Sequence, residues 1–96
     1  MKEYYVYILA SRKDGVLYIG VTGDLLKRIY QHQQGAIEGF TKKYQVKKLV
    51  YFESCNNINV CLNREKQLKA WRRDWKVALI EANNPNWNDL SDGLYN

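Results

Sequence analysis

Five side chains in this 96-residue chain are of the types that hydrolyse phosphodiester bonds with the help of a metal ion. They are two tyrosines, an arginine, a histidine and one glutamate, namely Tyr7, Tyr18, Arg28, His32 and Glu65. An arginine fork stabilises the charge that develops on a phosphate in the transition state. A Mg²⁺ ion often takes only one or two protein carboxylates and completes its shell with water and phosphate oxygens. One glutamate can therefore suffice for a metal site that is weak until the substrate arrives.

Each of these residues also has a plainer interpretation. Glu65 could form an ion pair with Lys69, four residues further along one helix. Arg28 and His32 could be ordinary surface residues, and the tyrosines could be a cross-strand packing pair. As a base, a tyrosine would need a neighbouring cation or a metal-bound water to lower its pKa from about 10, whereas a hydrogen-bond donor needs no shift. The histidine could orient a water or a tyrosine, or shuttle a proton near neutral pH.

A predicted β-hairpin must position the tyrosines. Residues 4–10 and 16–22 alternate in polarity around the turn signal Asp14-Gly15. In the register that this turn favours, Tyr7 and Tyr18 lie on one face together with Gly20. The other face is apolar and carries Tyr4, Val6, Ile8, Ala10, Leu17, Ile19 and Val21. We expect the apolar face to pack on helices and the tyrosine face to form a shallow basic groove, with the arginine, histidine and glutamate at its rim.

Periodicity predicts one more strand and three main helices. The predicted elements are a helix over about 25–34, a strand over 48–54, a helix over about 58–71 and a final helix over about 74–82. Residues 35–44 contain two glycines and are predicted to be a loop. The predicted fold class is α/β (α+β): a three-stranded, largely antiparallel sheet flanked by three main helices. We expect one domain over residues 1–90 and a flexible tail over 91–96.

Polar residues mark where the predicted helices begin and end. Asp24, Asn57 and Asp74 are candidate N-caps, and Gly35 is placed to end the first helix. Trp87 is expected to pin the start of the acidic C-terminal segment to the domain.

The charge distribution is asymmetric along the chain. All fifteen Lys and Arg lie in residues 1–76 and give this part a net charge of +8, whereas the last twenty residues carry −3. A basic body of this kind attracts phosphate backbones. Charge alone does not distinguish a nucleic-acid-binding protein from an ordinary basic domain. The candidate nucleic-acid-binding residues are Lys27, Lys42, Lys43, Lys69, Arg72 and Arg73.

Composition and the cysteine count favour a cytoplasmic protein. Hydrophobic residues make up 46% of the chain, enough for a compact core, but no apolar run reaches the length of a membrane span. The N-terminus lacks the features of a secretory signal peptide. Cys55 and Cys61 are expected to be reduced thiols, because their spacing without a companion Cys/His pair is a poor zinc signal. We therefore expect a cytoplasmic monomer that does not contact membranes.

The order and spacing of the motifs resemble the GIY-YIG endonuclease superfamily, and in particular its small stand-alone bacterial members. The resemblance runs from Tyr4 to about Leu90. It rests on the segments Val6-Tyr7-Ile8-Leu9, Leu17-Tyr18-Ile19-Gly20-Val21-Thr22, Arg28-Ile29-Tyr30-Gln31-His32, Phe40-Thr41-Lys42-Lys43-Tyr44, Leu49-Val50-Tyr51-Phe52-Glu53, Arg64-Glu65-Lys66-Gln67-Leu68-Lys69 and Asn84-Pro85-Asn86-Trp87-Asn88-Asp89-Leu90.

This resemblance implies roles for the residues that match the motifs. Tyr7 and Tyr18 match the tyrosines of the two triplets, and Gly20 matches a glycine that allows close approach. Arg28 and His32 match the arginine and histidine of the catalytic helix. In addition, Glu65 matches the glutamate that holds a single Mg²⁺ or Mn²⁺. A tyrosine-assisted water would attack in line while the arginine stabilises the developing charge, and the resemblance leaves open which tyrosine is the base.

The expected function is a divalent-metal-dependent DNA endonuclease that acts at branched or damaged DNA. The alternative is a non-catalytic nucleic-acid-binding module that uses the same basic groove, and a third possibility is a protein-interaction domain. Two departures from the superfamily bear on activity. Tyr5 stands where the first triplet has its glycine, and we expect no additional DNA-recognition domain, so a protein partner would supply specificity.

Overall fold

The computed structural model describes residues 2–94, which form a three-stranded antiparallel sheet between two layers of helices. Strand β1 spans Tyr4–Ala10, β2 spans Leu17–Thr22 and β3 spans Lys48–Cys55. The strand order is β2-β1-β3, so β1 is central and β2 forms one edge. The predicted fold class is therefore confirmed.

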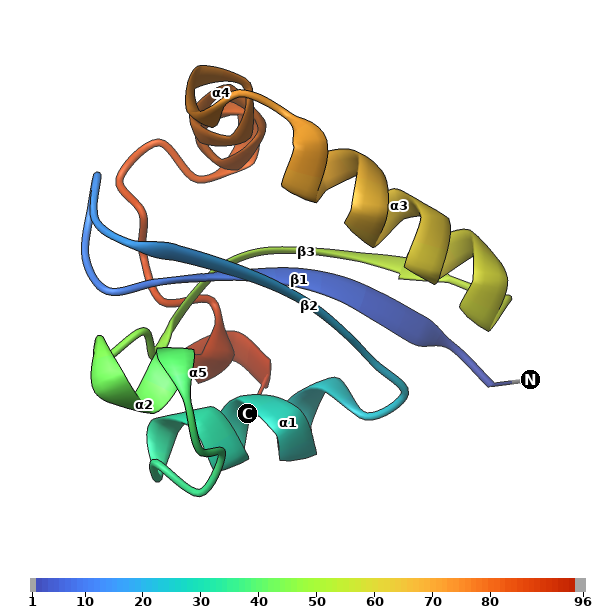
Figure 1. Ribbon diagram of the computed structural model, residues 1–96, viewed down its shortest axis with the longest axis horizontal. Coiled ribbons are helices and arrows are strands. Elements are labelled where there is room, and N and C mark those ends of the chain that lie inside the picture. The colour runs from blue at the N-terminus through green and yellow to red at the C-terminus, as the bar shows by residue number, and fades with distance from the viewer. Residues whose placement is uncertain (1, 95–96) are drawn as a thin grey trace.

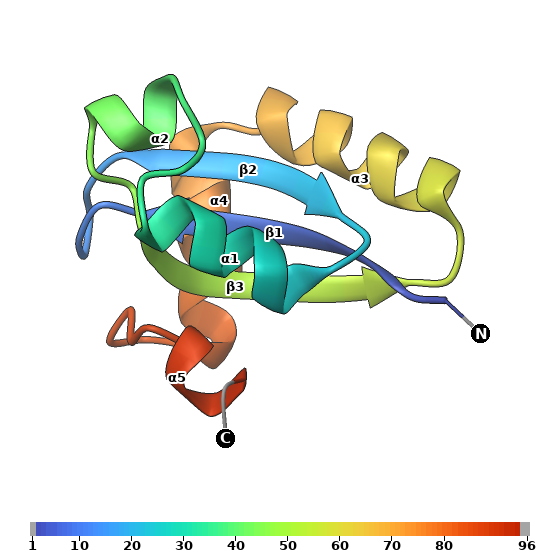
Figure 2. The ribbon, with the colours of Figure 1, turned by 90° about the horizontal axis from the view of Figure 1, so that it is seen from below.

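The helices cover both faces of this sheet (Figures 1 and 2). On one face lie α3 and α4, which span Ile58–Ala70 and Arg73–Asn83. On the other face lie α1, α2 and α5, which span Leu25–Gln33, Phe40–Lys43 and Ser91–Leu94. In the view of Figure 2, α2 and α3 both lie toward the β2 edge of the sheet, although they belong to different layers. Among residues 2–94, no helix is long and apolar enough to cross a membrane.

The hairpin has the predicted register. Tyr7 pairs with Gly20, and Leu9 pairs with Tyr18. Odd positions of β1 therefore oppose even positions of β2, which puts the two tyrosines on one face of the sheet. The observed pairing confirms the predicted register, and Val6, Ile8 and Ile19 lie together on the opposite face.

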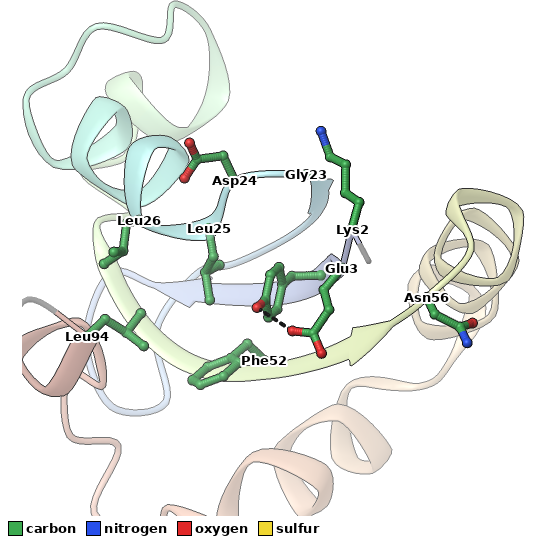
Figure 3. Close-up of a pocket in the computed structure, with 10 residues that line it drawn as sticks. Lys2, Glu3, Gly23, Asp24, Leu25, Leu26, Phe52, Asn56 and Leu94 are labelled. Atoms are coloured by element: carbon green, nitrogen blue, oxygen red, sulfur yellow. Dashed lines mark hydrogen bonds between the residues drawn. The ribbon is translucent and has the colours of Figure 1, made fainter.

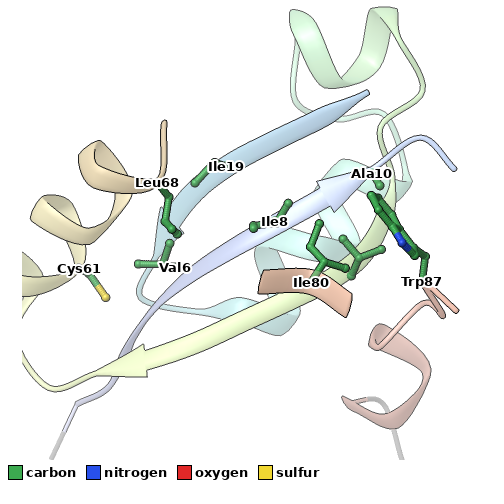
Figure 4. Packing of buried hydrophobic residues seen from close by; sticks show 9 residues of the cluster. Val6, Ile8, Ala10, Ile19, Cys61, Leu68, Ile80 and Trp87 are labelled. Atoms are coloured by element: carbon green, nitrogen blue, oxygen red, sulfur yellow. The ribbon is translucent and has the colours of Figure 1, made fainter. Parts of the chain in front are cut away.

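Two apolar clusters hold the layers together, one on each face. The first contains Val6, Ile8 and Ala10 of β1, which pack against α3 and α4 (Figure 4). The second contains Tyr7, Leu9, Leu25, Ile29, Val46 and Leu49. The expectation that the tyrosine face forms a shallow basic groove is therefore wrong for the part around Tyr7. Apolar residues of α1 and of the segment before β3 cover that face, and Tyr7 is only 1% exposed.

Local capping follows the predictions in two helices and departs from them in a third. The side chain of Asp24 accepts a hydrogen bond from the backbone N–H of Lys27, and Asn57 caps α3 in the same way. Helix α4 begins earlier than predicted, with Arg72 at its N-cap and Asp74 in its first turn. The predicted loop over residues 35–44 is wrong in part, because Phe40–Lys43 form the short helix α2.

The C-terminal segment is docked against β3. Trp87 is fully buried, and its indole N–H donates to Glu81 over 2.7 Å, so it pins this segment as predicted. The amide of Leu90 donates to the carbonyl of Leu49 over 2.8 Å. Of the tail expected to be flexible, residues 91–94 form α5 with Ser91 buried, and residues 95–96 lie outside the described part of the chain.

Cys55 and Cys61 form a disulfide, contrary to the expected pair of reduced thiols. Their Cα atoms lie 6.0 Å apart, a usual separation for a disulfide. The bond links the last residue of β3 to the first turn of α3, and the expectation failed because the spacing alone does not show that the two side chains face each other.

Candidate active site

The side chain of Tyr7 crosses the neighbouring strand β2 at Gly20. A Cβ atom added at Gly20 would lie 2.5 Å from the Tyr7 hydroxyl and 2.6 Å from its Cζ. Only a residue without a side chain leaves room for the phenol here. Gly20 therefore allows a tyrosine of the central strand to reach toward the β2 edge of the sheet.

The hydroxyl of Tyr7 forms a hydrogen bond with His32 of α1. The Tyr7 hydroxyl lies 3.0 Å from Nε2 of His32, and the other ring nitrogen, Nδ1, lies 3.0 Å from the hydroxyl of Thr41 on α2. His32 is 2% exposed and Thr41 is 4% exposed, so the chain Thr41–His32–Tyr7 is buried along its whole length. Because both ring nitrogens are engaged, the imidazole has one orientation, and it fixes the position of the Tyr7 hydroxyl.

Tyr18 lies beside this chain with its ring partly buried. Its ring centroid is 6.3 Å from that of Tyr7 and 5.5 Å from that of His32. The two tyrosines therefore share one site, with Tyr7 at its buried end and Tyr18 nearer the surface.

Arg28 and Glu65 belong to helices on opposite faces of the sheet (Figure 1). Arg28 belongs to α1 and Glu65 to α3, and both act electrostatically on the Tyr7 hydroxyl. Helix α3 packs against β2 as well as β1, which brings its glutamate to the β2 edge. The candidate site therefore takes side chains from the sheet and from helices on both of its faces.

Burial determines the protonation of Tyr7. Its pKa lies well above the ordinary value of 10, chiefly because the buried phenolate would be poorly solvated. Tyr18 and Glu65 raise the pKa further, and Arg28 opposes them. Tyr7 is therefore a neutral phenol at neutral pH, a state that donates a hydrogen bond without ionising.

His32 is neutral as well, and its burial makes stability depend on pH. Burial, and to a smaller extent Arg28, lowers the pKa of His32 from 6.5 to about 4. Below pH 6.5 the unfolded chain binds a proton that the folded protein does not, so the free energy of unfolding falls as the pH falls toward 4. We expect His32 to account for a loss of about 2 kcal/mol between pH 7.5 and pH 5.

Urea unfolding of the wild type and of His32→Gln across this pH range checks the expectation. The glutamine variant lacks the titrating group, so the difference in unfolding free energy between the two proteins should shrink by that amount as the pH falls. A difference that stays constant with pH would show that His32 titrates normally in the folded protein.

The carboxylate of Glu65 is largely shielded from solvent and lies next to a lysine. Lys69 lies 3.4 Å from its Oε2 atom, so the plainer interpretation as a helix ion pair describes a real contact. The glutamate side chain is nevertheless only 19% exposed, against 54% for the lysine. Residues 2–94 contain no cluster of three or more His, Cys, Asp or Glu side chains that could hold a metal ion. A single carboxylate beside a phosphate-binding surface fits an ion that keeps most of its water, as Mg²⁺ does.

The six predicted nucleic-acid-binding cations differ in their surroundings. Lys69 lines a shallow hollow with Tyr18, and Lys27 lines another with Arg28. By contrast, Arg72 pairs with Asp74 over 2.6 Å, and Arg73 donates to the Gly15 carbonyl over 2.6 Å. Lys42 pairs with Glu38 over 2.9 Å, and Lys43 lies over the ring of Tyr44.

Two residues of the site were missed by the sequence analysis. Thr41 follows His32 by nine residues across a loop, so no periodicity connects them. Lys76 of α4 lines the same hollow as Tyr18 and Lys69, and its place in the long basic helical run was the only signal for it.

A separate hollow lies near the N-terminus of α1 (Figure 3). Leu25, Leu26 and Phe52 contribute apolar walls, and the hydroxyl of Tyr5 donates to Glu3 over 2.9 Å at its rim. None of the five predicted catalytic residues lines this hollow. The shallow surface at the β2 edge is therefore the candidate active site.

Comparison with known proteins gives one consistent result. The family model of the GIY-YIG catalytic domain matches residues 3–78. The chain is 38% identical over 80 residues to a UPF0213 protein of Staphylococcus saprophyticus, covering 83% of this chain and 96% of that protein. It is 41% identical over 78 residues to a UPF0213 protein of Clostridium perfringens, covering 81% and 83% of the two chains.

A solved structure has the same architecture. The solution NMR structure of a UPF0213 protein from Bacillus halodurans superposes with a TM-score of 0.56 and is 28% identical in sequence. The match covers 91% of this chain and 92% of that chain.

Proposed function

Because the chain belongs to the GIY-YIG catalytic domain family, a family of nucleases, we propose that it is a divalent-metal-dependent DNA endonuclease. The observation that supports this proposal is the passage of Tyr7 over Gly20 to His32 beside Tyr18, and Arg28 and Glu65 both act electrostatically on the same phenol. Tyr7, Arg28 and Glu65 come from β1, α1 and α3, and the two helices lie on opposite faces of the sheet (Figure 1).

The proposed mechanism divides the work between the two tyrosines. Tyr7 stays protonated. When the Nε2–H of His32 donates to the Tyr7 hydroxyl and the Thr41 hydroxyl donates to Nδ1, the hydrogen of the phenol can be donated to the attacking water and orient it. Tyr18 lies closer to solvent and is the tyrosine that the substrate can reach. The guanidinium of Arg28 stabilises the negative charge that builds on the phosphate during in-line attack.

Glu65 is the proposed ligand of a single Mg²⁺ or Mn²⁺. A bound divalent ion would neutralise charge on the phosphate and act as a Lewis acid. Lys69 competes for the same carboxylate, but its side chain is 54% exposed and can turn to the phosphate backbone instead. The residues at the site therefore fit an ion that arrives together with DNA.

The alternative, a nucleic-acid-binding module without turnover, uses the same surface. The buried chain Thr41–His32–Tyr7 favours the enzyme, because binding a phosphate backbone needs surface cations and not a hydroxyl held in a fixed position. A protein partner that supplies specificity, a monomeric state and a cytoplasmic location remain part of the proposal.

A panel of DNA substrates tests the proposed function. Linear duplex, nicked, flapped and branched DNAs would be incubated with the protein in Mg²⁺, in Mn²⁺ and in EDTA. We expect cleavage only with a divalent ion and faster cleavage of the flapped or branched substrates than of linear duplex. DNA binding without metal-dependent cleavage of any substrate would favour the binding module.

A further inference from the structure

A row of aromatic rings leads from the candidate active site onto the surface. It consists of Tyr18, Phe40 and Tyr44, which we call the aromatic row. The ring planes of Tyr18 and Phe40 are 28° apart with centroids 6.4 Å apart, and the centroids of Phe40 and Tyr44 are 4.8 Å apart. The row therefore begins at a tyrosine of the site and ends beyond α2.

Two rings of this row are exposed to solvent. Phe40 and Tyr44 are each 46% exposed. The neighbouring residue Thr41 faces inward and supports His32, so α2 has one side that serves the site and another that presents an aromatic surface. Neighbouring exposed rings of this kind form a candidate binding surface.

Lysines surround the aromatic row. Lys69 and Lys76 line one hollow together with Tyr18 and Phe40. Another hollow is lined by Lys42, Lys43, Phe40 and Tyr44. Aromatic faces among cations are the surface that single-stranded nucleic acids bind, because the bases stack on the rings while the phosphates meet the lysines.

We propose that Phe40 and Tyr44 bind an unpaired nucleobase of a DNA strand, next to the phosphate that lies at Tyr18. Bases within a duplex are stacked on one another and cannot offer their faces to these rings. The site therefore selects DNA with unpaired nucleotides. The proposal rests on the proposed function only for the place of the phosphate, since the stacking itself needs neither cleavage nor a metal.

Binding measured without metal separates this proposal from the nuclease activity. The affinity of the full chain for a fluorescent single strand and for a duplex of the same length would be measured in EDTA at one low salt concentration. We expect Phe40→Ala and Tyr44→Ala each to weaken single-strand binding by about 5- to 150-fold and to leave duplex binding within about twofold. Phe40→Trp keeps a stacking face and should retain single-strand affinity.

Tyr30→Ala is the matched control, because Tyr30 is 56% exposed on α1 and takes no part in the aromatic row. It should bind both DNAs as the wild type does. A strand that carries 2-aminopurine adds a second measurement, since stacking on a ring quenches its fluorescence. We expect quenching with the wild type and with Phe40→Trp, and reduced quenching with Phe40→Ala.

The results distinguish the two proposals. Normal stacking and selective binding by a protein that never cleaves DNA would overturn the nuclease activity and support the aromatic row. Equal losses for single strand and duplex, unchanged single-strand affinity in both alanine variants, or no single-strand binding by the wild type would each overturn the base-stacking site.

Discussion

Replacing Glu65 with glutamine is expected to slow metal-dependent DNA cleavage by a factor on the order of 10³, because a metal ion at a phosphate contributes several kcal/mol to transition-state stabilisation. The amide keeps the size of the side chain but removes the charge that holds the ion. DNA binding in EDTA should be unchanged or slightly tighter, since a negative charge leaves the surface. Single-turnover cleavage in Mg²⁺, with binding measured separately in EDTA, checks both parts.

Glu38→Gln is the matched control for this experiment. Glu38 pairs with Lys42 over 2.9 Å at the same four-residue spacing as Glu65 and Lys69, but its side chain is 82% exposed. If Glu65 were only a helix ion-pair partner, both substitutions would cost at most about 0.5 kcal/mol of stability and little activity. Cleavage by Glu65→Gln within tenfold of the Glu38→Gln rate would remove Glu65 from the proposed metal site.

The substitution Gly20→Ala is expected to damage both folding and catalysis. Its Cβ atom would meet three atoms of Tyr7 at 2.5 to 3.0 Å, and the ring is enclosed by Tyr18 and His32. Overpacking of a buried position costs about 1–3 kcal/mol. We expect a loss of this size in the free energy of unfolding, with cleavage reduced at least 100-fold because the Tyr7 hydroxyl leaves its place, about the effect of removing one well-placed donor.

A double-mutant cycle identifies the cause of the loss. Tyr7→Leu lacks the ring atoms that the new methyl group would meet, so Gly20→Ala should cost little stability in that background. Gly93→Ala introduces the same methyl group into open space and should be close to neutral. Equal costs of Gly20→Ala with tyrosine and with leucine at position 7 would mean that close approach of the phenol is not the reason for the glycine.

The sheet and the three long helices could be predicted because their signals are local. The alternation around Asp14-Gly15 determines the hairpin register, and side chains such as Asp24 and Asn57 mark helix starts through hydrogen bonds within their own turn. Helix α2 was missed because it is one turn long and follows two glycines. The closed tyrosine face was missed because Leu9, Val46 and Leu49 come from scattered positions that meet only in the folded chain.

The sequence was enough to predict which residues form the candidate site, but not how their side chains contact one another. Register places Tyr7 and Tyr18 together, and the family motifs point to Arg28 and Glu65. The burial of Tyr7, the support of His32 by Thr41 and the disulfide all depend on contacts between segments that have no common periodicity. These contacts are tertiary, so no window of the sequence contains them.

The single turn of α2 carries two residues with different roles. Its inward residue Thr41 supports His32, and its outward residue Phe40 belongs to the aromatic row. A mutation at position 40 that tilts the turn also shifts Thr41, and through His32 the hydroxyl of Tyr7. Under the two proposals, a change at this turn that alters the preferred DNA strand would therefore also alter cleavage.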